Sequence, residues 1–282
     1  MRATIYICTR DRGSELALLL QSLRTQTWQD WDVLIVDGSR PNICVTQHHI
    51  ASVINRMKLE GHAVHVEQAL VPGVCYARQR AIETDPWPQN ELIVRLDDDV
   101  ILTPMYLEKL YDGIMHGYDL MSGLTIHCAN PDIMREVRFV QPIMNKIMMS
   151  PEGDLLSLGD DCAHTYGVEQ IIPIHHFRSC AMYKRALHTV HGAHYKLGLT
   201  NVGFREETFI SIRAILAGYK LGVHTGAINH HLQTPSGGCR FQDYNKLCAS
   251  DDAKFREWLK AKVVEHGDFI TKYNEQVLHA GH

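Results

Sequence analysis

The sequence lacks several patterns that would place it in a common class of protein. It contains neither a G-x-G-x-x-G fingerprint nor a G-x-x-x-x-G-K loop, which argues against a dinucleotide-binding or P-loop site. No apolar run approaches the length of a transmembrane segment, and no signal peptide precedes the first predicted strand. None of the eight cysteines forms a C-x-x-C pair, so no zinc knuckle or dithiol redox motif is indicated. We therefore expect a cytoplasmic protein, located in the host cytoplasm if the source is viral.

The sequence also has no excess of positive charge. Its formal net charge is -4, whereas a broad nucleic-acid-binding surface usually shows a basic balance. A nucleic acid as partner is therefore unsupported by charge. With 45% hydrophobic and 21% charged residues, the chain of 282 residues has the composition of a globular protein with a substantial core.

Predicted strands alternate with predicted helices over the first third of the chain. Apolar and β-branched runs predict strands at 3–9, 31–37, 62–66 and 92–96, and helical periodicity predicts helices from Ser14, over 46–59 and within 73–83. This alternation indicates βαβ units, and hence an α/β fold with a mostly parallel sheet flanked by helices. Ligands of such sheets bind at the carboxyl ends of the strands.

Three consecutive carboxylates, Asp97, Asp98 and Asp99, follow the fourth of these strands. Adjacent like charges raise one another's pKa unless a cation or hydrogen-bond donor lies nearby. Oxygen ligands suit Mg²⁺ or Mn²⁺, which keep water ligands and bind a substrate's phosphates as well. The alternative is a solvated acidic turn before a helix predicted from Pro104.

Polar residues also end the first two strands. Thr9 ends the first strand and Asp37 the second, so both are expected to converge with Asp97 at one edge of the sheet. Arg78, near the start of a helix, supplies positive charge for a phosphate. The residues therefore predict a site for a nucleobase or ribose, a metal ion and a phosphate group.

The second half of the chain gives a less regular pattern. Helices are predicted over 104–116, 185–190, within 206–220, where Gly218 stops the helix, and over 251–264, and strands over 119–126, 177–183, up to 224 and from 227 to 230 or 231. Between 127 and 170 the pattern weakens into what we interpret as insertions and loops. The composition of 234–240, T-P-S-G-G-C-R, predicts a flexible loop, and we expect its Gly-Gly hinge to let it close over a bound ligand. The helix over 251–264 is expected to clamp onto the core.

Several short motifs occur together along the chain. They are T-R-D-R at 9–12, L-x-S-L-x-x-Q-T at 20–27, V-D-G-S at 36–39, G-x-x-x-A-R-Q at 73–79, L-D-D-D at 96–99, E-E-x-x-x-x-x-R with G-Y-K at 206–220, and a late histidine pair. In this order they resemble family 2 of the glycosyltransferases, which have the GT-A fold. The set covers most of the chain. The resemblance implies an inverting, metal-dependent enzyme of hexosyltransferase type that uses a nucleoside-diphosphate sugar and Mn²⁺ or Mg²⁺.

The resemblance also implies roles for individual residues. The residues implied to hold the donor nucleotide are Thr9, Arg10, Asp37, Arg78, Asp97 and Asp98. Asp99 is implied to bind the metal, with His231 or its neighbour His230 as a further ligand. The family often has Asp where this chain has Gly38, so the contact to the base is open.

A pair of acids at the start of the predicted 206–220 helix is implied to supply the general base. The family has Glu-Asp there, whereas this chain has Glu206 and Glu207. The resemblance implies Glu207 as the base, with Glu206 as the other candidate. The alternative is that Glu207 only interacts with the helix macrodipole. The two histidines could equally be structural, because adjacent residues of a strand point to opposite faces.

The resemblance divides the chain into a nucleotide-sugar-binding half at 1–125, an acceptor-binding and catalytic half at 126–240, and a helical tail at 241–282. Two other functions share a related architecture. A sugar nucleotidyltransferase would need a glycine-rich basic loop after the first strand, which 9–13 is not. A non-catalytic carbohydrate-binding protein would have lost the acids, which are present. The acceptor is open: a glycan, a lipid-linked sugar, a protein or a modified DNA base each offers a hydroxyl.

Overall fold

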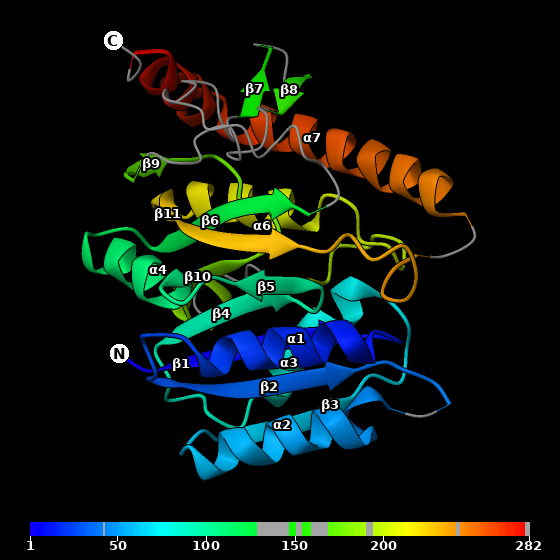
Figure 1. The fold of residues 1–282 in the computed structure, drawn as a ribbon. Coiled ribbons are helices and arrows are strands. Elements are labelled where there is room, and N and C mark those ends of the chain that lie inside the picture. Colours follow the sequence, from blue (N-terminus) through cyan, green and yellow to red (C-terminus); the bar gives the residue numbers. More distant parts are fainter. Residues whose placement is uncertain are drawn as a thin grey trace.

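The computed structural model describes residues 1–41, 43–128, 147–150, 154–158, 169–189, 194–240 and 243–279. Within these ranges one nine-stranded mixed sheet runs in the order β3-β2-β1-β4-β10-β6-β11-β5, with β9 also paired to β11 (Figure 1). The strands of this sheet are β1 (Ala3–Thr9), β2 (Trp31–Asp37), β3 (Val64–Gln68), β4 (Leu92–Asp97), β5 (Val100–Leu102), β6 (Leu120–His127), β9 (Ile171–Pro173), β10 (Ala181–Lys184) and β11 (Leu221–His231). Strands β7 (Ile147–Met149) and β8 (Leu155–Leu158) form a separate pair.

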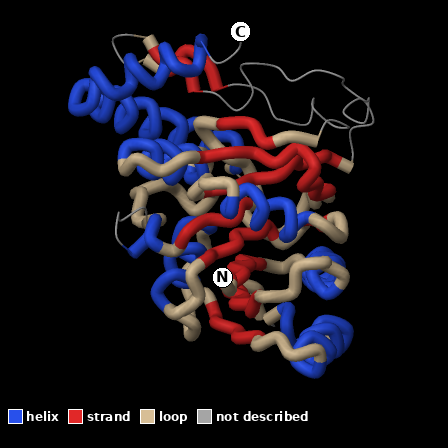
Figure 2. Tube along the Cα trace, turned by 90° about the vertical axis from the view of Figure 1, so that its left-hand side faces the viewer, coloured by secondary structure: helices blue, strands red, loops and turns tan. Residues whose placement is uncertain are grey.

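Helices cover both faces of the sheet (Figure 2). They are α1 (Gly13–Arg24), α2 (His48–Leu59), α3 (Val74–Thr84), α4 (Tyr106–Met115), α5 (Ala186–Thr189), α6 (Glu206–Leu216) and α7 (Tyr244–His279), with a 3-10 turn η1 (Cys44–Thr46). Helices α1, α2 and α4 pack on one face, and α3, α5 and α6 on the other. Every residue of β2 is buried, as expected for a strand covered on both sides. The predicted α/β class is confirmed.

The parallel half of the sheet brings the predicted strand ends together. Strand β1 pairs in parallel with β2 on one side and β4 on the other. Thr9 lies opposite Asp37, and Cys8 lies opposite Asp97. The sequence prediction that these ends meet at one edge is therefore confirmed.

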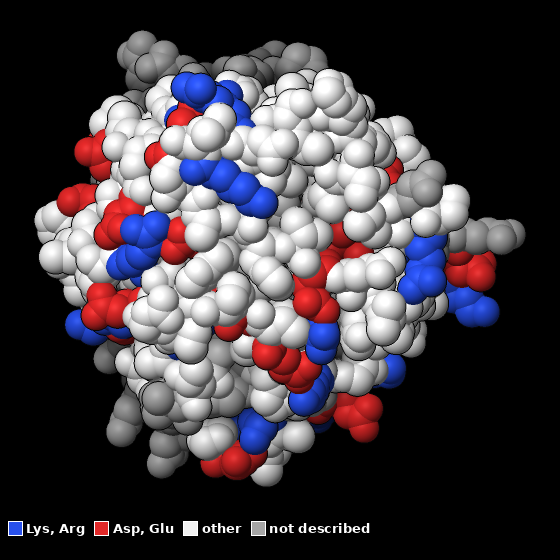
Figure 3. All heavy atoms as spheres, turned by 90° about the horizontal axis from the view of Figure 1, so that it is seen from below, with Lys and Arg blue, Asp and Glu red and all other residues white. Residues whose placement is uncertain are grey.

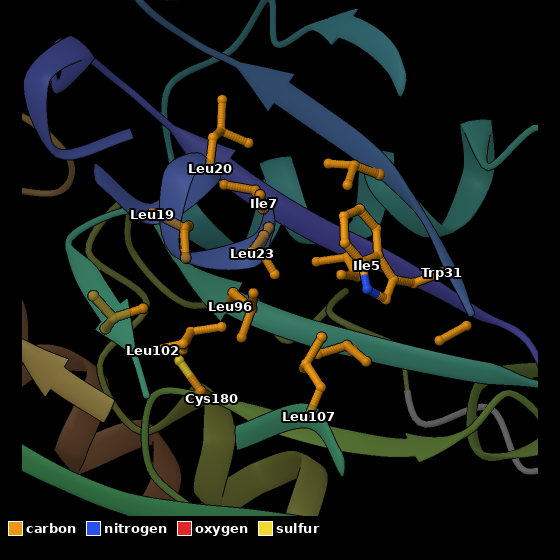
Figure 4. Close-up of a cluster of buried hydrophobic side chains, with 14 of the residues drawn as sticks. Ile5, Ile7, Leu19, Leu20, Leu23, Trp31, Leu96, Leu102, Leu107 and Cys180 are labelled. Atoms are coloured by element: carbon orange, nitrogen blue, oxygen red, sulfur yellow. The ribbon is translucent and has the colours of Figure 1, made fainter. Parts of the chain in front are cut away.

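The core on the α1 face is built from the apolar stripe of that helix. Leu19 and Leu23 of α1 belong to one hydrophobic cluster with Ile5 of β1 and Trp31 of β2, and all four side chains are fully buried (Figure 4). Burying side chains of this size stabilises the fold by roughly 1.5–3 kcal/mol each. This packing fixes β1 and β2, and with them the edge where the site lies.

Several element boundaries differ from the sequence prediction. The helix predicted from Glu206 was expected to stop at Gly218, and it ends at Leu216, with Gly218 in a left-handed conformation with φ of +84°. The strand expected over 177–183 begins only at Ala181. The residues before it form a loop in which Ser179 has φ of +56°. The two segments expected at 221–224 and 227–231 are one strand, with a register shift between His224 and Ile228.

Very short strands cannot be predicted from the periodicity of the sequence. Strands β5 and β9 have three residues each, too few to give a repeating pattern, and neither was predicted. The third strand runs over Val64–Gln68, two residues later than expected. Much of the weakly patterned stretch, at 129–146, 151–153 and 159–168, lies outside the described residues.

The C-terminal helix is longer than the predicted 251–264. Helix α7 begins at Tyr244, extends to His279 and has a break in helical geometry at His266. Phe255 and Leu259 are fully buried, and the ring of Phe255 lies 5.1 Å from that of Phe209 on α6. The predicted clamp onto the core is confirmed.

The face at the β3 end of the sheet shows basic and acidic atoms side by side, without a continuous basic area (Figure 3). Arg24 and Arg56 both pair with Glu60, and Arg80 pairs with Glu67. This face therefore offers no broad basic surface. Within the described part of the chain, no helix has the length and apolarity needed to cross a membrane.

Candidate functional site

A cavity of about 580 Å³ lies at the carboxyl ends of the central strands. The residues that line it come from both halves of the chain and include Thr9, Arg10, Arg12, Gly38, Arg78, Asp97, Asp98, Asp99, Ser179, Arg205, Glu206, Glu207, His231, Gly238 and Arg240. Most of the residues predicted from the sequence are therefore brought to one site. Asp37 and His230 are not among the residues that line the cavity.

Every acid of the triplet has a partner, and Asp98 and Asp99 share one. Asp97 accepts hydrogen bonds from Arg78 Nη2 at 2.8 Å and from Ser179 Oγ at 2.6 Å. Asp98 Oδ1 lies 2.9 Å from Arg12 Nη1, and Asp99 Oδ2 lies 3.0 Å from the same nitrogen. These cations and donors allow three adjacent carboxylates to coexist, so the triplet is no solvated turn. Asp98 and Asp99 are 4% and 2% exposed.

Arg12 lies within the acidic cluster, and the sequence analysis gave it no role. Its side chain is 8% exposed and lies between Asp98 and Asp99. Burial raises the pKa of Asp98 to about 7, while Arg12 opposes that rise. Arg12 therefore supplies much of the positive charge that holds this pair of acids.

The residues predicted to bind a metal are partly brought together. Asp99 Oδ1 lies 3.1 Å from Nε2 of His231, and this contact raises the pKa of His231 against the effect of burial. His230 is the neighbouring residue of β11, and the geometry favours His231 of the two. Across the described residues, no three or more His, Cys, Asp or Glu side chains are already arranged around a metal position. The donor set fits a metal whose coordination a substrate's phosphates and water complete.

Asp37 is fully buried and does not line the cavity. Its Oδ1 accepts from the backbone N–H of Ser39 at 2.9 Å and its Oδ2 from that of Val45 at 3.2 Å. These bonds fix the loop after β2. Its predicted contact with a nucleoside stays a prediction, whereas Thr9 and Arg10 line the cavity.

The two acids that begin α6 belong to a buried ionic network. Arg95 of β4 is almost fully buried, and its Nη1 and Nη2 donate to the two oxygens of Glu206 at 3.0 and 2.7 Å. Arg95 Nη2 also donates to Oε1 of Glu207 at 2.7 Å. Arg78 Nε lies 3.3 Å from Glu206 Oε1. Two arginines thus hold Glu206, and one of them also holds Glu207.

The two glutamates differ in exposure and in electrostatic surroundings. The side chain of Glu206 is 3% exposed, and that of Glu207 is 27% exposed. Burial raises the pKa of Glu206, and Arg95 opposes the rise. Arg95 itself could have been noticed in the sequence, because an arginine inside the apolar run L-I-V-R-L must find an acidic partner once the strand is buried.

Helix α7 fixes the turn that leads into α6. Asp251 is fully buried and accepts from the backbone N–H and the hydroxyl of Thr200, at 2.7 and 2.8 Å, and from the N–H of Phe204 at 2.9 Å. Arg205, which precedes Glu206, has a left-handed φ of +74° and pairs with Asp252 at 2.7 Å. The C-terminal helix therefore orients the start of α6.

This mixed α/β sheet, with helices on both faces and acidic residues at the carboxyl ends of its central strands, has the GT-A fold. The fold is similar to the crystal structure of GalNAc-T7 with UDP, GalNAc and Mn²⁺, at a TM-score of 0.59 and 14% identity, over 82% of this chain and 43% of that one. It is also similar to S. aureus TarS 1-349 in complex with UDP-GlcNAc, at 0.58 and 13%, over 94% and 72%. Residues 4–187 match Glycosyl transferase family 2, and the chain belongs to that family.

The chain corresponds to only part of some of the similar structures. A second structure of S. aureus TarS aligns at a TM-score of 0.54 and 14% identity, over 92% of this chain and 43% of that one. This chain thus spans less than half the length of GalNAc-T7 and of that TarS chain. No curated protein matches the sequence.

Proposed function

We propose that the chain is a metal-dependent, inverting glycosyltransferase that moves a sugar from a nucleoside-diphosphate sugar to an acceptor hydroxyl. One observation carries the proposal. Asp97 at the end of β4, Asp98 and Asp99 in the turn that follows, and His231 at the end of β11 line one cavity, and Glu207 lines it from the start of α6. The cavity thus combines oxygen and imidazole ligands for a metal with a carboxylate that can take a proton.

Different side chains would bind different parts of the donor. In this proposal Thr9 and Arg10 contact the nucleoside, Asp97 the ribose, and Arg78 the diphosphate. Asp99 and His231 hold Mn²⁺ or Mg²⁺, which would offset the charge that develops on the leaving diphosphate. The structures of GalNAc-T7 with UDP and Mn²⁺ and of TarS with UDP-GlcNAc support a UDP-sugar as the first donor to test.

We assign the general base to Glu207 because of its contacts with Arg95. That arginine engages both carboxylate oxygens of Glu206 but a single oxygen of Glu207. Glu207 is also the more exposed of the two. It would take the proton of the acceptor hydroxyl while the acceptor oxygen attacks the anomeric carbon. The bond from that carbon to the phosphate oxygen breaks on the opposite side, which inverts the centre.

A thermal-shift assay with nucleoside diphosphates and UDP-sugars, each with Mn²⁺, Mg²⁺ or EDTA, tests the proposal. A ligand that binds only the folded chain raises its stability by about 2.7 kcal/mol at a hundred times its Kd. We expect stabilisation by one nucleoside diphosphate, lost in EDTA. A well-folded sample that responds to none of the panel would contradict the donor site. The cytoplasmic location and the glycan or other hydroxyl-bearing acceptor stay predictions.

A further inference from the structure

The segment 234–240, here called the strap, follows β11 and forms part of the cavity wall. The sequence predicts a flexible loop here, and in the structure it is hydrogen-bonded to the segment between β1 and α1 and to the first turn of α1. The N–H of Gly238 donates to the carbonyl of Arg10 at 2.7 Å, and the hydroxyl of Thr234 donates to Glu15 at 3.1 Å. Gly238, Cys239 and Arg240 line the cavity.

Arg12 makes two further hydrogen bonds to the strap. Its Nε donates to the carbonyl of Ser236 at 3.0 Å, and its Nη2 donates to that of Thr234 at 3.2 Å. Its remaining nitrogen, Nη1, is the one that lies at 2.9 and 3.0 Å from Asp98 and Asp99. One buried guanidinium therefore joins two backbone carbonyls of the strap to two acids at the proposed metal site.

The two glycines of the strap fit closely against this arginine. Gly238 has φ of +54°, and a Cβ there would lie 2.8 Å from the guanidinium carbon of Arg12. Gly237 has φ of +70°, and a Cβ there would lie 2.8 Å from Arg12 Cγ and 2.9 Å from the carbonyl oxygen of Arg10. All three distances are shorter than the contacts that Cβ atoms make in proteins, so a side chain at either position must displace the strap or the arginine.

We propose that Arg12 is a positioning residue that couples the strap to Asp98 and Asp99, so that a change at either end alters the other. The guanidinium is planar and rigid, and all three of its nitrogens are engaged, so its position cannot change without affecting both ends. A lysine has a single charged nitrogen and cannot make these contacts together. The inference rests on the proposed function only where it assigns Asp99 to a metal.

The coupling is measurable without any metal. Hydrogen exchange of the peptide that contains the strap would be compared in the wild-type chain and in Arg12→Lys, Asp99→Asn and Gly238→Ala, all in EDTA. Charge-assisted hydrogen bonds to buried groups are strong enough that we expect about tenfold faster exchange of the strap in each variant. Asp99 also contacts His231, three residues before the strap, so a double-mutant cycle of Asp99→Asn with Arg12→Lys isolates the part of its effect that passes through Arg12. Strap exchange in Asp99→Asn within twofold of wild type would overturn the proposal.

A second readout follows the coupling in the other direction. Gly238→Ala leaves every acid in place, yet we expect it to weaken Mn²⁺ binding, measured by electron paramagnetic resonance with UDP present, by about tenfold, since coupling between two sites is reciprocal. Gly61→Ala is the matched control, because Gly61 also has a positive φ, +98°, with nothing within 4 Å of an added Cβ. Unchanged Mn²⁺ affinity in Gly238→Ala would overturn the proposal. A wild-type chain that binds no Mn²⁺ would contradict the proposed function, while the metal-free exchange would still decide the role of Arg12.

Discussion

Replacing Glu206 and Glu207 separately by glutamine should give opposite results, although the two residues are adjacent. Glutamine keeps the shape of glutamate and removes its charge and basicity. Glu206 is held by Arg95 through both oxygens and approached by Arg78, whereas Glu207 shares only one contact with Arg95. We therefore expect Glu206→Gln to affect stability and Glu207→Gln to affect catalysis.

The magnitudes follow from burial. Breaking a buried ion pair by removing one partner costs about 3 to 5 kcal/mol, because the other charge stays buried without compensation. Glu206 and Arg95 are both 3% exposed and Arg95 keeps its contact with Glu207, so Glu206→Gln should lower the free energy of unfolding by the lower end of that range. Glu207 is partly exposed, so Glu207→Gln should lower the free energy of unfolding by less than about 1 kcal/mol. The loss of a general base should lower kcat for transfer by about 10²- to 10⁴-fold in Glu207→Gln.

Urea unfolding and sugar transfer, each measured on both variants, separate the two roles. Binding of UDP with Mn²⁺ should be retained in Glu207→Gln, because that residue is assigned to the acceptor hydroxyl. Glu83→Gln, on the exposed end of α3, serves as the surface control. Full transfer activity in Glu207→Gln would refute the base assignment and point to Glu206. An unfolding midpoint in Glu206→Gln equal to that of wild type would refute the role given to Arg95.

Three further predictions concern the metal, the C-terminal helix and pH. Asp99→Asn should remove the stabilisation by UDP and Mn²⁺ in the thermal-shift assay, as EDTA does in wild type, while leaving the chain folded. Asp251→Asn should weaken three hydrogen bonds to the turn before α6, which lowers stability by about 1–3 kcal/mol in urea unfolding and should reduce kcat more than UDP binding. Burial, with Arg178 and Arg205 nearby, lowers the pKa of His176 from 6.5 to about 4, so the unfolded chain binds the extra proton. The free energy of unfolding should then fall as the pH falls from 6.5 to about 4, by up to about 3 kcal/mol at 1.4 kcal/mol per pKa unit. The same unfolding measurements on His176→Gln should lack this pH dependence.

The position of the site could be predicted because it depends on strand order and polarity. Buried parallel strands must end at a common edge, so the polar residues that follow β1 and β4 were expected to meet. The structure confirms this through the register of Thr9 with Asp37 and of Cys8 with Asp97. The inward position of the Asp37 carboxylate was not predictable, since it depends on the backbone N–H groups of the loop that follows.

Partners far apart in sequence account for most of what the sequence analysis missed. Arg12 contacts Asp98 across 86 positions and the strap carbonyl of Ser236 across 224. Arg95 and Glu206 are 111 positions apart. Neither pairing leaves a periodic or local pattern in the sequence. A buried charge within an apolar strand requires a partner, but only the fold says which one.

The buried network offers a physical account of why two glutamates stand where the family has Glu-Asp. Arg95 can hold Glu206 bidentately and still reach Glu207, because Nη2 lies 2.7 Å from a carboxylate oxygen of each. An aspartate in place of Glu207 would be one methylene shorter, so its carboxylate would have to give up either the contact with Arg95 or its reach into the cavity. The longer acid allows both. Glu207→Asp should therefore keep a carboxylate of similar basicity and yet lose transfer activity, whereas recovery of full activity in that variant would show that the base needs no contact with Arg95.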